Sequence, residues 1–307
     1  MQPLVSIIIP TYNRAHLIGE TLDSILAQTY THWECIVVDD GSTDDTETLL
    51  QTYIDKDPRF QYHKRPDTHL PGGNGARNYG FEVSKGEYIQ WFDSDDVMLP
   101  EKLELKVNAI VEYEVDIVVS KSKYLNSSSD FYHYDYTAQD ISFESFSMGN
   151  VSWVTDDFIV KRTVASAISF NEIMRSGQEY NYCCKLLLQS DEIHFIDKFL
   201  TLRRDTEDSI GNNRQKNRDT YLKSRLYAYW YTYIDVLKIT SHKTFEKFSL
   251  LTCISSYLKT NKPMVLPDGF YKALYKTFGF KSIYFLFSKW SKLLFGKYFY
   301  FYSKLKL

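Results

Sequence analysis

The sequence predicts an α/β fold, with helices on both faces of a doubly wound, mostly parallel sheet and an α-helical C-terminal extension. Over the first 120 residues, short apolar runs rich in β-branched residues alternate with segments of helical periodicity, as expected for right-handed crossovers between parallel strands. Beyond about residue 212 the sequence becomes helical, aromatic and basic. We therefore expect one domain at residues 1–212 and a helical extension at residues 213–307.

The predicted strands are short apolar runs, several of them closed by Pro, Asp or Gly. In chain order they are Leu4–Pro10, Trp33–Val38, Phe60–His63, Tyr88–Phe92, Val115–Ser120 and His194–Leu202. Residues 121–170 are rich in Ser, Tyr and Asp and show no clear motif, so they predict loops and irregular strands.

Helices are predicted between these strands from apolar spacing and from residues that favour helix ends. Asn13 is expected to cap a helix through Leu26, and Ser42-Thr43-Asp44-Asp45 to form a capping box for a helix through Ile54. Further helices are expected around 76–84, 100–113 and 179–189.

Composition excludes several classes of protein. Lys and Arg number 36 against 39 Asp and Glu, and this net charge of -3 argues against a nucleic-acid partner. The four cysteines have no spacing typical of disulfides or metal sites, so reduced thiols and a cytoplasmic location are expected. The N-terminus carries no signal-peptide pattern, and the uncharged stretch 248–258 is too short to span a bilayer.

Three polar motifs directly follow predicted strands. They are Thr11-Tyr12-Asn13-Arg14, Asp39-Asp40 and Asp93-Ser94-Asp95-Asp96. In open parallel sheets, ligands bind beyond the carboxyl ends of the strands, so the three motifs point to one site.

The third motif predicts a divalent metal. Its carboxylates Asp93, Asp95 and Asp96 are hard ligands suited to Mn²⁺ or Mg²⁺, and they repel one another without a cation. The alternative is a solvated acidic turn.

The remaining polar segments are ambiguous on their own. Asp39-Asp40 would serve equally as a helix-capping turn or as an acceptor for a nucleobase. Residues 72–78 offer backbone N–H groups and Arg77 to a phosphate. Glu179 alone is best explained as a favourable first-turn residue.

Four segments together closely resemble the family-2 glycosyltransferases of GT-A fold. They are Val5–Arg14, Ile36–Asp44, Gly75–Asn78 and Phe92–Asp96, in the family's order. The resemblance implies an inverting, metal-dependent transfer of a sugar, usually from a UDP-sugar, to a saccharide or lipid-linked acceptor. Residues 1–120 would then bind the nucleotide-sugar, and residues 121–212 would supply the acceptor side and the base.

The resemblance also implies roles for single residues. Thr11 and Tyr12 would line the nucleobase pocket, Asp40 would hold the uracil edge, and Asp96 would be the main metal ligand. The implied nucleotide-sugar set is Pro10, Thr11, Tyr12, Arg14, Asp39, Asp40, Arg77, Asn78 and Asp95, with Asp95 and Asp93 as further metal ligands.

Two positions depart from the family pattern. Gly177-Gln178-Glu179 stands where the family has Gly-Glu-Asp, which makes Glu179 the implied base. Where many members carry Arg-x-His, this chain reads Arg203-Arg204-Asp205, so Asp205 would replace the His near the metal or diphosphate, with Arg203 or Arg204 facing phosphate.

Rival functions remain open at this stage. Phe92–Val97 also resembles the nucleophile motif of haloacid-dehalogenase-type phosphatases, although Asp39-Asp40 precede it where that family's later acids should follow. Sugar-phosphate nucleotidyltransferases need a Gly-rich loop after the first strand, which Pro10–Asn13 does not supply. A catalytically idle module that binds a sugar-nucleotide is the third alternative.

The C-terminal extension predicts a peripheral membrane contact. Residues 259–307 hold ten Lys, one Asp and 15 aromatic residues, a charge of +9. Helical spacing places Ile283, Leu286, Phe287, Trp290, Leu293 and Leu294 on one face, and Lys281, Lys289 and Lys292 on another. Such a helix suits the cytoplasmic membrane face, and the alternative is a helix packed on the catalytic domain.

Overall fold

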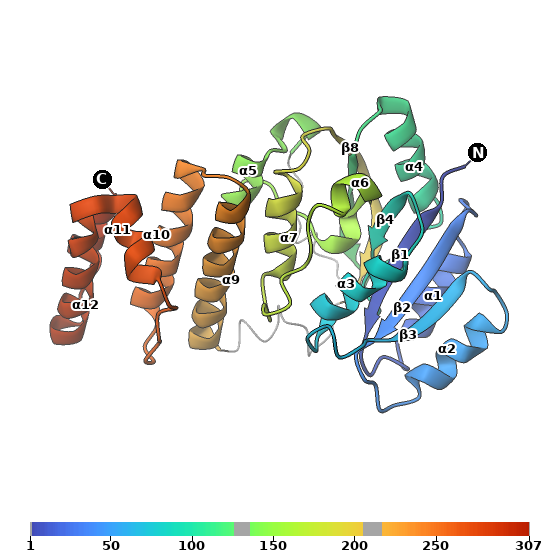
Figure 1. Ribbon diagram of the computed structural model, residues 1–307, viewed down its shortest axis with the longest axis horizontal. Helices are drawn as coiled ribbons and strands as arrows, with labels where there is room; N and C mark the ends of the chain where they lie inside the picture. Colours follow the sequence, from blue (N-terminus) through green and yellow to red (C-terminus); the bar gives the residue numbers. More distant parts are fainter. Residues whose placement is uncertain (1, 126–135, 205–216, 307) are drawn as a thin grey trace. The chain divides into compact units, whose positions relative to one another are not determined.

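The computed structural model describes residues 2–125, 136–204 and 217–306 (Figure 1). The described residues include an eight-stranded mixed sheet of order β3-β2-β1-β4-β7-β6-β8-β5. The strands are β1 (Val5–Thr11), β2 (Trp33–Asp39), β3 (Phe60–Lys64), β4 (Tyr88–Trp91), β5 (Val97–Met98), β6 (Ile117–Tyr124), β7 (Phe158–Lys161) and β8 (Ile193–Arg203). The predicted α/β fold is thereby confirmed.

Strand direction divides the sheet into two parts. β3, β2, β1 and β4 pair in parallel, as do β6 and β8. β7 lies between β4 and β6 and is antiparallel to both, and β5 is antiparallel to β8. The strands β3, β2, β1 and β4 therefore form the parallel sheet that the sequence predicts. The antiparallel strand β7 joins this parallel part to β6 and β8.

Helices cover both faces of this sheet (Figure 1). They are α1 (Ile18–Leu26), α2 (Thr46–Ile54), α3 (Gly73–Val83), α4 (Lys102–Tyr113) and α6 (Arg162–Ala165). Two further helices are α5 (Phe143–Ser147) and α7 (Gln178–Leu186). Alternate residues of β2 serve opposite faces: Cys35 and Val37 join the main core, whereas Ile36 and Val38 pack with Ala76 of α3. This two-sided burial explains the unbroken apolar runs of the parallel strands.

Two expected helix caps are wrong. Asn13 lies in a loop with φ 51°, and its side chain accepts from Thr43 N at 2.8 Å instead of capping α1. The predicted capping box is also absent, because Ser42 Oγ donates to Asp39 Oδ1 at 2.7 Å and Asp44 Oδ1 accepts from Thr46 N at 3.1 Å. Ser42 Oγ also accepts from Asn13 N at 2.8 Å and Asp44 Oδ2 from Ala15 N at 3.1 Å, so in both cases the polar side chains join the loop after β1 to the loop after β2.

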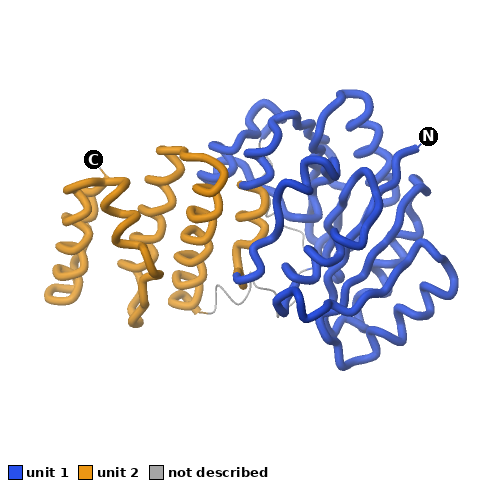
Figure 2. The backbone as a smooth tube through the Cα atoms, in the orientation of Figure 1, with its two compact units in different colours: residues 1–173, 185–205 blue, residues 174–184, 206–307 orange. Residues whose placement is uncertain are grey.

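The contacts divide the chain into two units (Figure 2). Unit 1 comprises Met1–Ile173 and Lys185–Asp205, and unit 2 comprises Met174–Cys184 and Thr206–Leu307. The start of α7, with Glu179, thus belongs to the second unit, although the sequence assigns it to the first domain. The expected boundary at residues 212 and 213 lies outside the described residues.

Unit 2 is a helical body with its own apolar core. It contains α9 (Arg218–Ile239), α10 (Lys243–Lys259), α11 (Phe270–Phe278), α12 (Ile283–Phe295) and α13 (Phe299–Lys306). Its core includes Leu226, Trp230, Leu250, Phe270 and Phe285. Among the described residues, no helix combines the length and apolarity needed to cross a bilayer.

Candidate active site

The carboxyl ends of the parallel strands bring the first two polar motifs together. Thr11 ends β1 and is paired in register with Asp39, which ends β2. The Asp40 N–H donates to Thr11 O at 2.9 Å, which extends the ladder into the loop. This junction at the edge of the sheet is the expected position for a ligand.

Asp39 is buried, and its carboxylate is hydrogen-bonded to the turn that follows it. Its Oδ1 accepts from Gly41 N at 3.1 Å and from Ser42 N at 2.8 Å. Its Oδ2 accepts from the Tyr62 hydroxyl at 2.9 Å. Asp39 therefore shapes the turn, and the neighbouring Asp40 carries the more accessible carboxylate.

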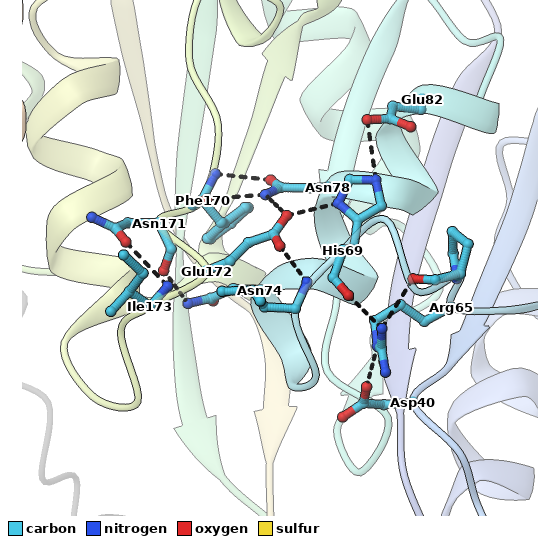
Figure 3. A network of polar contacts seen from close by, with 12 residues as sticks. Asp40, Arg65, His69, Asn74, Asn78, Glu82, Phe170, Asn171, Glu172 and Ile173 are labelled. Atoms are coloured by element: carbon cyan, nitrogen blue, oxygen red, sulfur yellow. Dashed lines mark hydrogen bonds and ion pairs between the residues drawn. The ribbon is translucent and has the colours of Figure 1, made fainter.

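Asp40 is held by a polar network that the sequence does not reveal (Figure 3). Arg65 Nε donates to Asp40 Oδ1, and Arg65 Nη1 donates to His69 O at 2.5 Å. Glu172 then fixes the 65–72 loop, since its carboxylate accepts from His69 Nδ1 at 2.7 Å and from Leu70 N at 2.6 Å. Asp40 is thus oriented through a chain of contacts that ends on Glu172.

Asn78 belongs to the same network. Its amide nitrogen donates to Phe170 O at 2.9 Å and to Glu172 Oε1 at 2.8 Å, while its oxygen accepts from Phe170 N at 2.9 Å. Both amide hydrogens are therefore used within the protein, and Asn78 joins α3 to the segment at residues 170–172.

His69 lies between two carboxylates, Glu172 at 2.7 Å and Glu82 at 3.2 Å. Burial lowers the pKa of His69, but the hydrogen bonds and charges of Glu172 and Glu82 outweigh burial and raise it overall. Burial raises the pKa of Glu172, and its hydrogen bonds with His69, Asn78 and Leu70 N lower it overall. The pair is therefore stabilised as imidazolium and carboxylate.

The end of β1 offers one buried hydroxyl and one exposed ring. Pro10 is half-buried within β1. Thr11 is buried and its Oγ1 has no hydrogen-bond partner, whereas Tyr12 is 53% exposed. Arg14 pairs with Asp95, with 3.7 Å between Nε and Oδ2. These residues provide an apolar wall, a free hydroxyl and a cation beside the third motif.

The third motif separates into two parts. Asp95 faces Arg14, while the carboxylates of Asp93 and Asp96 converge with that of Asp156, with one oxygen of each within 4.8 Å of the others. Asp93 pairs with Arg77 Nη2 at 2.6 Å, and Asp96 Oδ1 accepts from Arg204 N at 2.8 Å. Asp95 is not part of this convergent group.

Arg203 and Arg204 approach the motif from the end of β8. Arg203 Nε lies 3.6 Å from Asp96 Oδ2, and Arg204 Nε donates to Asp95 O at 3.1 Å. The adjacent Asp205 lies outside the described residues.

The sequence analysis missed Asp156, which lies in a single 3-10 turn, Thr155–Asp157, just before β7. Each step along an antiparallel pair raises one residue number and lowers the other, so extending the Gln90–Ile159 pairing brings Asp93 opposite Asp156. Accordingly, Asp93 N donates to Asp156 Oδ1 at 2.9 Å. The only local signal is a pair of acids directly beside the apolar Phe158–Val160.

The local electrostatics are unfavourable for so many carboxylates. Burial, followed by the charges of Asp93 and Asp96, raises the pKa of Asp95 to about 6, against the opposing effect of Arg14. Burial is also the main cause that raises the pKa of Asp96 and of Asp156, with Asp93 adding to both. The charge of Arg203, whose Nε lies 3.6 Å from Asp96 Oδ2, lowers the pKa of Asp96, and the charge of Lys102 lowers that of Asp156, but neither outweighs burial.

The convergent group fits a divalent cation. Within the described part of the chain, Asp156 Oδ2 is buried without a hydrogen-bond partner, which is costly unless another group satisfies it. Three carboxylate oxygens within 4.8 Å of one another match the hard, oxygen-rich ligand sets of Mg²⁺ and Mn²⁺.

Glu179 lies in the first turn of α7, within unit 2. The turn before it requires a glycine, because Gly177 has φ +69° and an added Cβ would lie 2.6 Å from the Cβ of Ala228 on α9. A cavity of ≈ 220 Å³ in the same unit is lined by residues that include Ser176, Tyr180 and Arg225. The tight turn therefore fixes where the helix carrying Glu179 begins.

Several known proteins resemble this chain in sequence or in fold. The family described as "Glycosyl transferase family 2" matches residues 6–176. The glycosyltransferase GlyG of Streptococcus pneumoniae is 30% identical over 225 residues, which covers 68% of this chain and 73% of GlyG. The Escherichia coli protein WfgD, named as a UDP-Glc:alpha-D-GlcNAc-diphosphoundecaprenol beta-1,3-glucosyltransferase, is 32% identical over 126 residues, 41% of this chain and 48% of WfgD.

Other relatives match over a shorter part of their length. Two uncharacterised glycosyltransferases of Rickettsia are 44% and 45% identical over 119 residues, and the match covers 35% of each.

Among solved structures, S. aureus TarS 1-349 in complex with UDP-GlcNAc has a TM-score of 0.66 at 20% identity. The match covers 89% of this chain and 80% of TarS 1-349, so it shows a shared fold. With the family match extending over more than half of the 307 residues, the chain belongs to glycosyl transferase family 2.

Proposed function

We propose that this protein transfers a sugar from a UDP-sugar to a hydroxyl of a saccharide or lipid-linked acceptor, with inversion and with a divalent metal. The observation that carries the proposal is the placement of the Asp40 carboxylate and of a convergent carboxylate group along one edge of unit 1. The first suits a nucleobase and the second suits a metal-bound diphosphate. The UDP-sugar named for WfgD and the UDP-GlcNAc bound by TarS support the choice of donor.

The nucleoside end of the donor is assigned to the loops after β1 and β2. Asp40 accepts from the uracil edge, Tyr12 offers its exposed ring for stacking, and Thr11 supplies a free hydroxyl. Arg65 holds the Asp40 carboxylate in one orientation. A fixed orientation reduces the entropy lost on binding and so favours affinity.

The diphosphate end is assigned to the acidic motif and its cations. Asp96 and Asp93 would hold Mn²⁺ or Mg²⁺, with Asp95 toward the ribose. When bound, the metal neutralises the charge that develops on the leaving diphosphate. Arg77, fixed by Asp93 at 2.6 Å, adds a positive charge of defined direction.

Glu179 is the proposed base. The acceptor oxygen attacks the anomeric carbon as the bond from that carbon to the diphosphate oxygen breaks, and the acceptor proton passes to the Glu179 carboxylate. The departing nucleoside diphosphate carries away the bonding electron pair. A single displacement of this kind inverts the anomeric centre.

The test is a screen of UDP- and GDP-sugars for Mn²⁺-dependent release of nucleoside diphosphate, with calorimetry on each donor that reacts. Glu179→Gln should bind the donor as tightly as the wild type and lose turnover. Asp191→Asn, at an exposed acid beyond the end of α7, is the matched control and should keep both. Wild-type turnover in Glu179→Gln would remove Glu179 from the role of base.

Two other outcomes separate the rival functions. Tight donor binding without turnover on any acceptor would favour a catalytically idle module. Release of inorganic phosphate from sugar phosphates, without nucleoside diphosphate release, would favour the phosphatase.

We further propose that α12 mediates peripheral contact with the cytoplasmic face of a membrane that carries the acceptor. Its predicted apolar face is uncovered by the described residues, with Trp290 65% and Leu293 82% exposed. Lys289 and Lys292 donate instead to the Tyr271 hydroxyl and Thr260 O of the same unit. An uncovered face with a Trp suits an interfacial position.

Vesicle flotation tests this contact. The intact protein should bind vesicles of anionic phospholipid, and Trp290→Ser combined with Leu293→Ser should weaken binding without loss of fold. Absence of binding by the wild type would contradict the proposal.

A further inference from the structure

We propose that Asp156 is a third carboxylate ligand of the divalent cation and that it reaches the site from the antiparallel strand β7. The inference rests on the metal-dependent function proposed above and adds a residue outside the acidic motif. It is carried by the convergence of one oxygen each from Asp93, Asp96 and Asp156 within 4.8 Å.

The two oxygens of Asp156 have different surroundings. Oδ1 accepts from Asp93 N at 2.9 Å, which fixes the carboxylate plane. Oδ2 has no hydrogen-bond partner among the described residues, and the residue is only 1% exposed. A bare, buried oxygen beside two other carboxylates is the position at which a cation removes the largest electrostatic cost.

The backbone that carries Asp156 is held by two buried lysines of α4. Lys102 Nζ donates to Asp156 O at 2.7 Å and to Thr201 Oγ1 at 2.6 Å. Lys106 Nζ donates to Asp157 O at 2.8 Å and to Gln90 Oε1 at 3.2 Å. Both lysines are fully buried.

The hydrogen bonds of both lysines to the turn go to its carbonyl oxygens, Asp156 O and Asp157 O. They therefore brace the turn, while Asp156 Oδ2 stays available. A ligand oriented by its surroundings in this way binds a metal with less reorganisation.

A second explanation is that Asp96 and Asp156 share one proton, because their carboxyl groups are close enough for a hydrogen bond between them. That arrangement would stabilise the pair without a metal. The two explanations are separable, because removing the charge of Asp156 should weaken Mn²⁺ binding if Asp156 is a ligand and leave it unchanged if the two acids share a proton.

The decisive experiment is calorimetric titration of the full chain with Mn²⁺ alone, for the wild type and for Asp156→Asn. Asn keeps the shape and still accepts from Asp93 N, so the loop is preserved. We expect the Kd for Mn²⁺ to rise about 10- to 100-fold. The melting temperature without metal should stay equal or rise, since one buried like charge is removed, and the increase caused by Mn²⁺ should shrink.

Asp157→Asn is the matched control, because Asp157 is equally buried but lies outside the convergent group. Its Mn²⁺ affinity should equal that of the wild type. If Asp156→Asn does not fold, Asp156→Glu provides the second variant. It keeps the charge and adds one methylene, so it should bind Mn²⁺ with an affinity between those of the wild type and of a chain lacking the ligand.

The outcomes separate this inference from the proposed function. Wild-type Mn²⁺ binding with unchanged affinity in folded Asp156→Asn would overturn the ligand role and support the shared proton. No Mn²⁺ binding by the wild type, with or without UDP, would overturn the metal-dependent function and this inference together.

Discussion

Two acidic motifs at the edge of the same sheet differ in how far the protein satisfies their carboxylates with hydrogen-bond donors. After β2, Asp39 accepts from Gly41 N, Ser42 N and Tyr62, and Asp40 pairs with Arg65. After β4, the carboxylates of Asp93, Asp96 and Asp156 converge, and one of their oxygens has no partner.

The difference teaches that an Asp-Asp pair acquires its function from what surrounds it. A carboxylate whose donors come from the protein is oriented and ready to accept from a neutral ligand such as a base. A group of carboxylates with an unsatisfied oxygen is suited to a cation. The four predictions that follow test this contrast, from the largest expected effect to the smallest.

Removing a charge from the β4 motif should have the largest effect. Asp96→Asn is expected to lower kcat/KM for Mn²⁺-dependent UDP release by about 10²–10³-fold, because the leaving diphosphate loses its electrostatic stabilisation. UDP binding measured in EDTA should change little. Asp45→Asn, an exposed acid in the loop after β2, is the control. Equal turnover in Asp96→Asn and in the control would contradict a metal-binding role for the motif after β4.

Removing a charge from the β2 motif should affect the nucleotide and spare the metal. Asp40→Asn is expected to raise the Kd for UDP about 10-fold, since a hydrogen bond to a charged acceptor is lost. Calorimetry with Mn²⁺ alone should give the wild-type affinity. A large fall in Mn²⁺ affinity would mean that the two motifs do not act separately.

The network behind Asp40 should make stability depend on pH. The pKa of His69 is raised in the folded chain, so its contribution is fully present below the unfolded value near 6.5 and is lost as pH rises through the folded value. Urea unfolding should therefore give a lower free energy of unfolding at pH 9 than at pH 6 from this source. His69→Gln should remove that component, and an identical pH profile in the variant would contradict the assignment.

The smallest effect is expected at Thr11. Its buried hydroxyl has no hydrogen-bond partner among the residues that the structure describes, so Thr11→Val should leave stability unchanged or slightly higher. If the hydroxyl serves the nucleotide, the Kd for UDP should rise a few-fold. A loss of stability with unchanged UDP affinity would instead assign Thr11 to packing.

The parallel half of the fold was predictable because its signals are local. Each of the apolar runs of β1, β2 and β4 is followed in the sequence by its own polar residues. The order of these segments along the chain carries the family resemblance. The helix caps failed for the opposite reason, since Asn13 bonds to Thr43 in a different loop.

The missed parts of the site depend on pairing between distant segments. Asp156 reaches Asp93 only through the antiparallel register of β7, and Glu172 reaches His69 only across the fold. Neither residue stands in a motif, so spacing along the chain could not place them. Glu179, by contrast, was singled out by resemblance to a motif, and its role remains a proposal.

The insertion of β7 between β4 and β6 has a consequence for the order of assembly during synthesis. The contacts of Asp40 with Arg65 and of Asp39 with Tyr62 need only residues up to 65. The carboxylate group needs Asp156, and hence a central strand that is made after both of its neighbours. As the chain leaves the ribosome, the edge after β2 can form early, while the acidic edge must wait until the middle of the sheet is closed.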